Sequence, residues 1–128
     1  MVMSRNVLLI SLILILWLIG AVWWLSGGQT SGKAAFDPTK IVFFYSTTCT
    51  HCQATEAWFE EQKISEKIQF DRKEISTPAV QAELQQATDY CKFDTSQGVG
   101  VPFLFAEGKC YMGSPDVEGY FKQKLELP

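Results

Sequence analysis

The alternation of apolar and polar positions divides the chain into an apolar N-terminal run, a short polar tract and a longer mixed region. Residues 7–25 are 19 consecutive residues without a charged side chain. As a helix this run would be about 28 Å long, close to the ~30 Å hydrocarbon core of a bilayer. Arg5 precedes the run and Lys33 is the first cation after it. This asymmetry predicts a transmembrane anchor within residues 1–25, with the N-terminus cytoplasmic.

A cleaved signal peptide is the alternative interpretation of the same run. Its apolar part usually has about 7 to 15 residues and ends in an Ala-x-Ala-like site, whereas here only Ser26, Gly27 and Gly28 follow. Both interpretations export the remainder of the chain, to the periplasm or the outer face of the membrane. The Gly/Ser-rich tract at residues 26–35 predicts a flexible linker to a domain at 36–128.

The mixed region begins with the run KIVFFYS at residues 40–46, which is apolar, aromatic and β-branched throughout. Such a run is typical of a strand covered on both faces, so we expect a central strand here. Thr47 or Thr48 can cap a helix that follows. The residues expected on the core-facing side of this helical region are Ala54, Ala57, Trp58 and Ile64.

The next elements are a shorter strand and a second helix. KIQFDRKEI at residues 67–75 alternates Ile68 and Phe70 before it becomes polar. Ser76, Thr77 and Pro78 form a helix start in which a cap precedes a proline. The expected buried stripe of this helix comprises Val80, Leu84, Ala87 and Cys91.

The C-terminal part predicts a hairpin and a last helix. GVGVPFLF at residues 98–105 reads as a strand, Gly108 as a tight turn and residues 110–113 as a returning strand. Ser114 and Pro115 start the helix, whose apolar face comprises Val117, Tyr120, Phe121 and Leu125. The order β-α-β-α-β-β-α predicts an α/β sandwich with a four-stranded mixed sheet and about three helices.

The distribution of charge along the chain bears on whether it binds nucleic acid. The chain has 11 basic and 14 acidic residues, a net charge of −3 that is spread without long runs. A protein that binds nucleic acid needs a basic stripe to neutralise phosphates, so we expect no nucleic-acid partner.

Candidate chemistry lies at Cys49 and Cys52, which are three residues apart at the start of the first helix of the domain. Unpaired amides and the helix dipole stabilise a thiolate there, so Cys49 is the expected nucleophile and the more sheltered Cys52 the resolving thiol. His51, the only histidine, lies between them. Its protonated form would stabilise the Cys49 thiolate and make the disulfide a stronger oxidant; an ordinary exposed histidine is the alternative.

The cysteine pair after an apolar strand, together with Val101-Pro102 before another strand, resembles the thioredoxin superfamily, and the compact element order is most similar to its glutaredoxin-like members. The resemblance covers residues 36–128. It implies a cis Pro102 against the cysteine pair and backbone groups of Val101 offered to the substrate. Cys-x-His-Cys is also similar to the motif of exported disulfide oxidases and isomerases. The residues expected to contact the substrate are Thr48, Thr50, Val101 and Pro102.

The sequence departs from the family pattern in and around the motif. Thioredoxins proper carry Trp before the first cysteine and Gly-Pro inside the pair, whereas this chain has Thr48 and Thr50-His51. Phe43 stands six residues before Cys49, where many thioredoxins hold a buried acid. Residues 113–116, GSPD, match in part the segment with which glutaredoxins hold glutathione. Glutathione therefore stays open as a co-substrate.

Cys91 and Cys110 lie outside the motif. They are either free buried residues or a structural disulfide, which would close a loop of about 20 residues and contribute roughly 3 kcal/mol. Zinc usually requires two close cysteine pairs, and covalent haem requires histidine where Gln53 stands. We therefore expect no metal, and no cofactor beyond a redox-active disulfide, glutathione excepted.

These features predict a membrane-anchored, extracytoplasmic thiol-disulfide oxidoreductase, with oxidation or isomerisation favoured over reduction. Its expected partners are exported proteins that contain cysteines and a membrane protein that resets the Cys49-Cys52 pair. Two alternatives stay open. One is a non-catalytic binding module of thioredoxin-like fold in the cell envelope, and the other is a glutathione-dependent reductase of the glutaredoxin type.

Overall fold

The structure, a computed structural model, describes residues 5–26 and 36–128, with side chains described for 7–21 and 36–128. The chain divides into two units, Met1–Lys33 and Ala34–Pro128. Residues 1–4 of the predicted anchor region and 27–35 of the predicted linker lie outside the described part.

The described part of the first unit is the helix α1, at Arg5–Ser26. Its large apolar side chains between Val7 and Ile19 are exposed. Within the residues that the structure describes, no helix has the length and apolarity needed to cross a membrane. The transmembrane segment predicted at residues 7–25 is therefore not found there.

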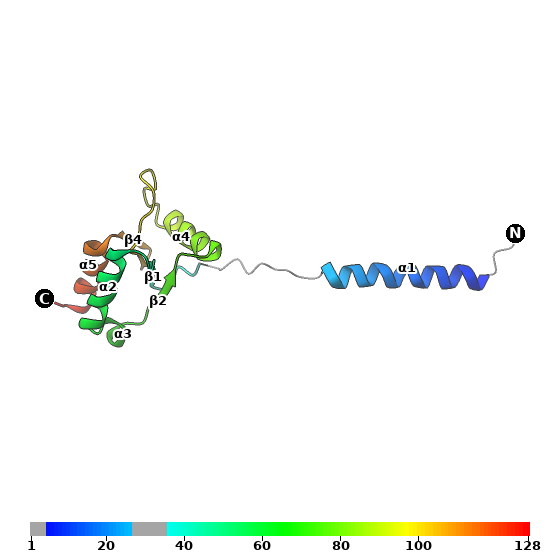
Figure 1. Ribbon diagram of the computed structural model, residues 1–128, viewed down its shortest axis with the longest axis horizontal. Helices are drawn as coiled ribbons and strands as arrows, with labels where there is room; N and C mark the ends of the chain where they lie inside the picture. Colours follow the sequence, from blue (N-terminus) through cyan, green and yellow to red (C-terminus); the bar gives the residue numbers. More distant parts are fainter. Residues whose placement is uncertain (1–4, 27–35) are drawn as a thin grey trace. The chain divides into compact units, whose positions relative to one another are not determined.

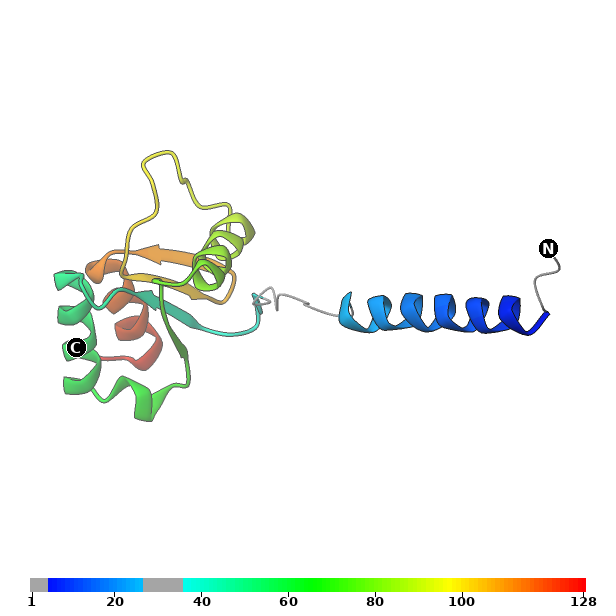
Figure 2. The same cartoon turned by 45° about the vertical axis from the view of Figure 1, so that its right-hand side comes forward.

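The second unit is a four-stranded sheet with helices on both faces (Figures 1 and 2). The sheet has the strand order β2-β1-β3-β4, in which β1 pairs parallel to β2 and the other pairs are antiparallel. The expected mixed sheet and the central position of the first strand are confirmed. In chain order the elements are β1 Val42–Tyr45, α2 Thr50–Glu61, α3 Ile64–Lys67, β2 Asp71–Glu74, α4 Pro78–Tyr90, β3 Phe103–Ala106, β4 Lys109–Met112 and α5 Ser114–Leu125.

Alternation along β1 produces two hydrophobic clusters, one on each face of the sheet. Phe43 points to the face covered by α2 and α5, where it meets Phe59 with ring centroids 4.9 Å apart. Val42 and Phe44 point to the face covered by α4, where Leu84 packs against them. Because both faces are covered, the central strand carries no polar alternation.

The buried face of α2 differs from the expected one. Cys52, Thr55 and Phe59 are buried, whereas Ala54 and Ala57 are exposed and Trp58 is half-buried. The helix begins at Thr50, with Cys49 rather than Thr47 or Thr48 as its N-cap, so a different stripe meets the sheet. Ile64 is buried as expected, but it belongs to the additional short helix α3.

The second strand also differs. β2 consists of the polar residues Asp71–Glu74, while Ile68 and Phe70 pack against the α2/α5 cluster before the strand begins. As an edge strand β2 accommodates charged side chains, and Lys73 forms an ion pair with the buried Glu83 of α4.

The predicted starts of the last two long helices, α4 and α5, and the predicted hairpin are confirmed. Thr77 caps α4 with Pro78 in its first turn, and α5 begins at Ser114 with Pro115 in its first turn. Glu107 and Gly108 have φ of 52° and 78°, the left-handed pair that a tight hairpin between β3 and β4 requires.

Candidate active site

Cys49 lies in the turn between β1 and α2, at the carboxyl end of a buried strand. Its backbone amide donates to the Ser46 carbonyl, 3.2 Å away, and its φ of −92° and ψ of 116° are the extended values of an N-cap residue. Its sulfur occupies the position where a Ser or Thr hydroxyl usually caps a helix. The amide of Cys52 donates to this sulfur over 3.2 Å.

The two thiols of the motif have different environments. Cys49 is half-buried, whereas Cys52 is completely buried one turn further along α2. Both are free, and the Cys49 thiol donates to the Val101 carbonyl over 3.5 Å. An incoming sulfur can therefore reach Cys49 and not Cys52.

The pKa values of the two thiols move in opposite directions. Partial burial by itself would raise the pKa of Cys49, but hydrogen bonds from the Cys52 thiol and from the amides of Cys52 and His51 outweigh it, so the pKa is lowered. Burial first, and the hydrogen bond to Cys49 second, raise the pKa of Cys52 to about 12. The Cys49 thiol therefore ionises more easily than the Cys52 thiol.

His51 and Thr50 are exposed in the first turn of α2. His51 lines a groove of about 390 Å³, whose lining also includes Val101, the residue whose carbonyl accepts from the Cys49 thiol. Thr50 does not border this groove, and neither does Thr48, whose hydroxyl lies 3.0 Å from that of Ser46. A contact of these threonines with a substrate stays a prediction.

The opposite wall of the groove comes from two segments far apart in sequence from the cysteines. The Val101-Pro102 peptide bond is cis, and Pro102 accepts a hydrogen bond of 2.9 Å from the amide of Gly113. This bond extends the hydrogen-bond ladder between β3 and β4 and places the start of α5 next to Pro102. The groove is lined by His51, Val101, Pro102, Gly113, Ser114 and Pro115.

A hydrogen-bonded chain that the sequence analysis missed ties α5 to the first turn of α2. The hydroxyl of the fully buried Thr55 donates to the Ser114 hydroxyl over 2.8 Å, and that hydroxyl donates to the His51 carbonyl over 3.2 Å. The sequence feature that could have indicated Thr55 is its position three residues after Cys52, on the buried face of α2. No local feature indicates Ser114, which lies 59 residues further along the chain.

Cys91 and Cys110 are joined in a disulfide with Cα atoms 6.1 Å apart. Cys91 is the C-cap of α4 and Cys110 lies on β4, so the bond connects a helix end to an edge strand. Neither lines the groove. Over residues 5–26 and 36–128, no cluster of three or more His, Cys, Asp or Glu side chains could hold a metal ion.

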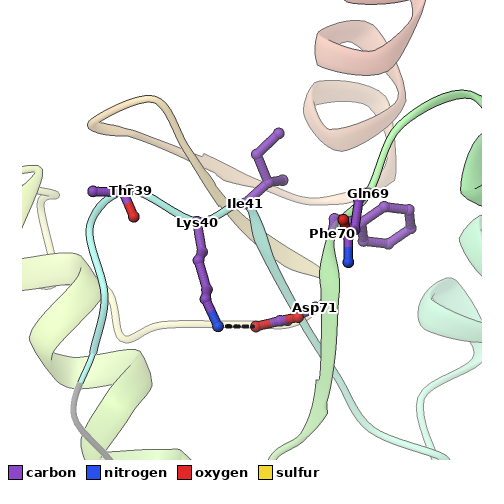
Figure 3. Close-up of a pocket in the computed structure, with 6 residues that line it drawn as sticks. All are labelled: Thr39, Lys40, Ile41, Gln69, Phe70 and Asp71. Atoms are coloured by element: carbon purple, nitrogen blue, oxygen red, sulfur yellow. Dashed lines mark ion pairs between the residues drawn. The ribbon is translucent and has the colours of Figure 1, made fainter.

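A second pocket, of about 290 Å³, lies at the amino end of β1, away from the cysteines that follow its carboxyl end (Figure 3). The Lys40–Asp71 ion pair, 3.6 Å long, lies across it beside Ile41 and Phe70 (Figure 3). No cysteine lines this pocket.

The comparisons with known proteins give no close relative. No family model matches the chain, and no curated protein matches it. Among solved structures, it is similar to buckwheat glutaredoxin in a complex with glutathione, with a TM-score of 0.46 and 16% identity over 76% of this chain and 79% of that one. It is also similar to oxidised glutaredoxin 2 from Chlamydomonas reinhardtii, with a TM-score of 0.45 and 20% identity over 75% of this chain and 91% of that one.

Proposed function

We propose that the chain is a thiol-disulfide oxidoreductase in which Cys49 exchanges disulfides with its substrate and Cys52 resolves the mixed disulfide. The observation that carries the proposal is the sulfur of Cys49 at the N-cap of α2, where it accepts the Cys52 amide at 3.2 Å. A sulfur in that position is stabilised as a thiolate, the form that attacks disulfides.

The exchange requires only the two thiols and the substrate. In the reducing direction the Cys49 thiolate attacks a substrate disulfide, forms a mixed disulfide and releases one substrate thiolate. Cys52 then loses its proton and attacks Cys49, which releases the second substrate thiolate and leaves the Cys49-Cys52 disulfide. Two electrons pass to the substrate. In the oxidising direction the same steps run backwards from the Cys49-Cys52 disulfide.

We propose oxidation or isomerisation as the natural direction. A lowered pKa of Cys49 stabilises the reduced pair as a thiolate and so makes the disulfide more oxidising. A protonated His51, exposed beside Cys49, would act in the same sense. Reduction potentials of such pairs range from about −270 to −120 mV, and a potential below about −250 mV would contradict this direction.

The location is part of the proposal and rests on the sequence. The uncharged run at residues 7–25, with Arg5 before it, supports a single-pass anchor that places the domain outside the cytoplasm. Substrates would then be exported proteins with cysteines, and a membrane protein would reset the Cys49-Cys52 pair. The Cys91–Cys110 disulfide fits an oxidising compartment.

A redox titration of the full-length chain against a thiol buffer, with both cysteine pairs mapped by mass spectrometry, tests the proposal. We expect Cys49 and Cys52 to interconvert between dithiol and disulfide while Cys91 and Cys110 stay bonded. A chain that binds its partner equally well with serine at both Cys49 and Cys52, and shows no exchange, would be a binding module instead.

A further inference from the structure

Met112, the last residue of β4, belongs to neither hydrophobic cluster of the domain. It is 37% exposed, and it is the only methionine in the described part of the chain. Its thioether sulfur accepts a hydrogen bond of 3.3 Å from the backbone amide of Gly100. A Cβ at position 100 would lie 3.8 Å from this sulfur, so the two residues are in close contact. The sulfur therefore links the edge of the sheet to the segment that leads to Val101.

The bond from Gly100 to Met112 holds a segment that projects from the domain between α4 and β3 (Figures 1 and 2). Within the described part of the chain, the hydrogen bonds of residues 94–100 stay inside the segment, except for this one. Val99 adds an apolar contact with the cluster on the α4 face of the sheet. Without the bond to Met112, the segment would be held by Val99 and by its two ends.

The segment ends at Val101, whose carbonyl accepts from the Cys49 thiol over 3.5 Å. The hydrogen bond to Met112 lies one residue before this carbonyl. The next hydrogen bond after it runs from the amide of Gly113 to the Pro102 carbonyl and is 2.9 Å long. The end of β4 therefore fixes the chain on both sides of the carbonyl that faces Cys49.

An exposed thioether sulfur can be oxidised by a hydroperoxide. The sulfur lone pair attacks one peroxide oxygen, the O–O bond breaks, and the proton of the attacked oxygen moves to the leaving hydroxide, so that a sulfoxide and water are formed. The sulfur loses two electrons and the peroxide gains them. Oxygen bonded on the side of Gly100 would occupy the position of its amide. Oxygen on the other side would leave a partial positive charge on the sulfur, which repels the N–H, so either product removes the hydrogen bond.

We propose that Met112 is a site of oxidation by hydroperoxides, and that its sulfoxide makes the Cys49 thiol more reactive. The inference goes beyond the proposed function, because it concerns a second redox reaction, at the sulfur of a methionine. The Val101 carbonyl stabilises the protonated form of Cys49, since it accepts a hydrogen bond from the thiol. A segment released from Met112 moves this acceptor away and uncovers the Cys49 sulfur. Both changes increase the rate at which that sulfur reacts.

The test uses the full-length chain in mild detergent, with Cys49 and Cys52 joined in a disulfide so that peroxide does not attack their thiols. Hydrogen peroxide is added and then removed with catalase, and mass spectrometry gives the extent of oxidation at Met112. The Cys49-Cys52 disulfide is then reduced with dithiothreitol, under conditions in which the second disulfide stays bonded. The rate of Cys49 alkylation is measured at about pH 6, below the ordinary pKa of a thiol.

We expect Met112 to be oxidised at a rate within about tenfold of that of N-acetylmethionine amide, because the residue is exposed. Oxidation should raise the alkylation rate of Cys49 at least about twofold, the factor given by the lower end of the net contribution of a hydrogen bond. Treatment with methionine sulfoxide reductase should restore the original rate. A Met112 that resists oxidation, or an unchanged alkylation rate in the fully oxidised chain, would overturn the proposal.

Two leucine variants provide the matched controls. Met112→Leu keeps an apolar side chain but lacks the acceptor for the Gly100 amide. Before treatment it should already show the alkylation rate of the oxidised wild-type chain, and peroxide should not change that rate. Met3→Leu removes a methionine outside the domain and should respond to peroxide as the wild-type chain does. A Met112→Leu chain that still responds to peroxide would assign the effect to another residue and contradict the proposal.

Discussion

At the residue scale, one helical turn separates a half-buried thiol with a lowered pKa from a buried thiol with a raised pKa. Cys49 and Cys52 have the same chemistry in the unfolded chain, and the fold separates them by exposing one and burying the other. The amide of Cys52 that stabilises the Cys49 sulfur is also the amide of the resolving residue. The motif therefore supplies its own hydrogen-bond donor to the Cys49 sulfur.

Alkylation kinetics test this difference directly. In the Cys52→Ser chain, where the serine hydroxyl can replace the Cys52 thiol as a donor to the Cys49 sulfur, we expect the rate of Cys49 alkylation to rise with a midpoint below that of N-acetylcysteine amide measured alongside, because the pKa of Cys49 is lowered. In the Cys49→Ser chain, Cys52 should stay unreactive through pH 8.5, because burial raises its pKa. An ordinary midpoint for Cys49 would remove the basis of the catalytic proposal.

The Thr55–Ser114–His51 chain should act on Cys49 through position alone. Thr55→Val removes the hydroxyl that donates to Ser114, so the Ser114 hydroxyl, which donates to the His51 carbonyl in the first turn of α2, loses the group that positions it. The His51 amide, which hydrogen-bonds the Cys49 sulfur, is then held less firmly. We expect the alkylation midpoint of Cys49 to rise, and unfolding in urea to show a loss of about 1 kcal/mol.

Thr88→Val is the matched control. Thr88 is also fully buried and also donates a 2.8 Å hydrogen bond, to the Gln85 carbonyl of α4. It should lose similar stability without moving the Cys49 midpoint, and Thr55→Ser should restore that midpoint. Equal shifts in the two valine variants would assign Thr55 a purely structural role.

At the element scale, two cross-links hold α4 in place: the Cys91–Cys110 disulfide at its C-terminal end and the Lys73–Glu83 ion pair to the edge strand β2. They connect a helix to both edges of the sheet, because β2 and β4 are the outer strands. The segment between α4 and β3, which projects from the domain in both views (Figures 1 and 2), begins at the disulfide and ends at Val101-Pro102.

Removing the disulfide with Cys91→Ser and Cys110→Ser together should lower the free energy of unfolding by about 3 kcal/mol, since the bond closes a loop with a sequence separation of 19. Urea denaturation measures the loss. Disulfide exchange at Cys49 should persist at temperatures where the variant is folded. A loss well below 1 kcal/mol would mean that the bond contributes little to the stability of the domain.

Removing only Lys73 from the Lys73–Glu83 ion pair should destabilise the domain more than replacing both residues. Glu83 is 2% exposed and its Oε2 has no hydrogen-bond partner in the described part of the chain, so Lys73→Met leaves a buried carboxylate without its cation. We expect a loss of about 3 kcal/mol by urea denaturation. The double change Lys73→Met with Glu83→Leu should recover most of it, and a double variant no more stable than Lys73→Met would contradict this account.

At the scale of the whole molecule, the proposed membrane anchor predicts on which side of the membrane the domain lies. If residues 7–25 anchor the chain, the full-length protein should stay with membranes after alkaline carbonate extraction, and a protease added outside should cleave the domain. Leu14→Lys, which places a charge in the middle of α1, should increase the fraction of the chain that carbonate extracts, because a central lysine costs roughly 2.5 to 3.5 kcal/mol on insertion. Wild-type chain in the carbonate supernatant would refute the anchor.

Local sequence patterns predicted an element correctly where its conformation and burial depend on its own residues. The run KIVFFYS predicted a strand covered on both faces, Thr77-Pro78 and Ser114-Pro115 predicted helix starts, and Glu107-Gly108 predicted a hairpin turn. Each of these depends on backbone preference or on burial period, which neighbouring residues set. The pattern failed at α2 and β2, where contact with other elements selects the buried stripe and the strand register.

The amino-acid order alone therefore established that a cysteine pair lies at a helix start after a buried strand, because spacing and period are local properties. The order also predicted that Cys52 is the more sheltered thiol, which is confirmed. Which carbonyl faces the Cys49 sulfur and which threonine supports its turn depend on contacts between segments about 50 or more residues apart. No local pattern encodes such contacts, since they form only when β3 and α5 pack beside α2. The groove next to Cys49 is a product of that packing.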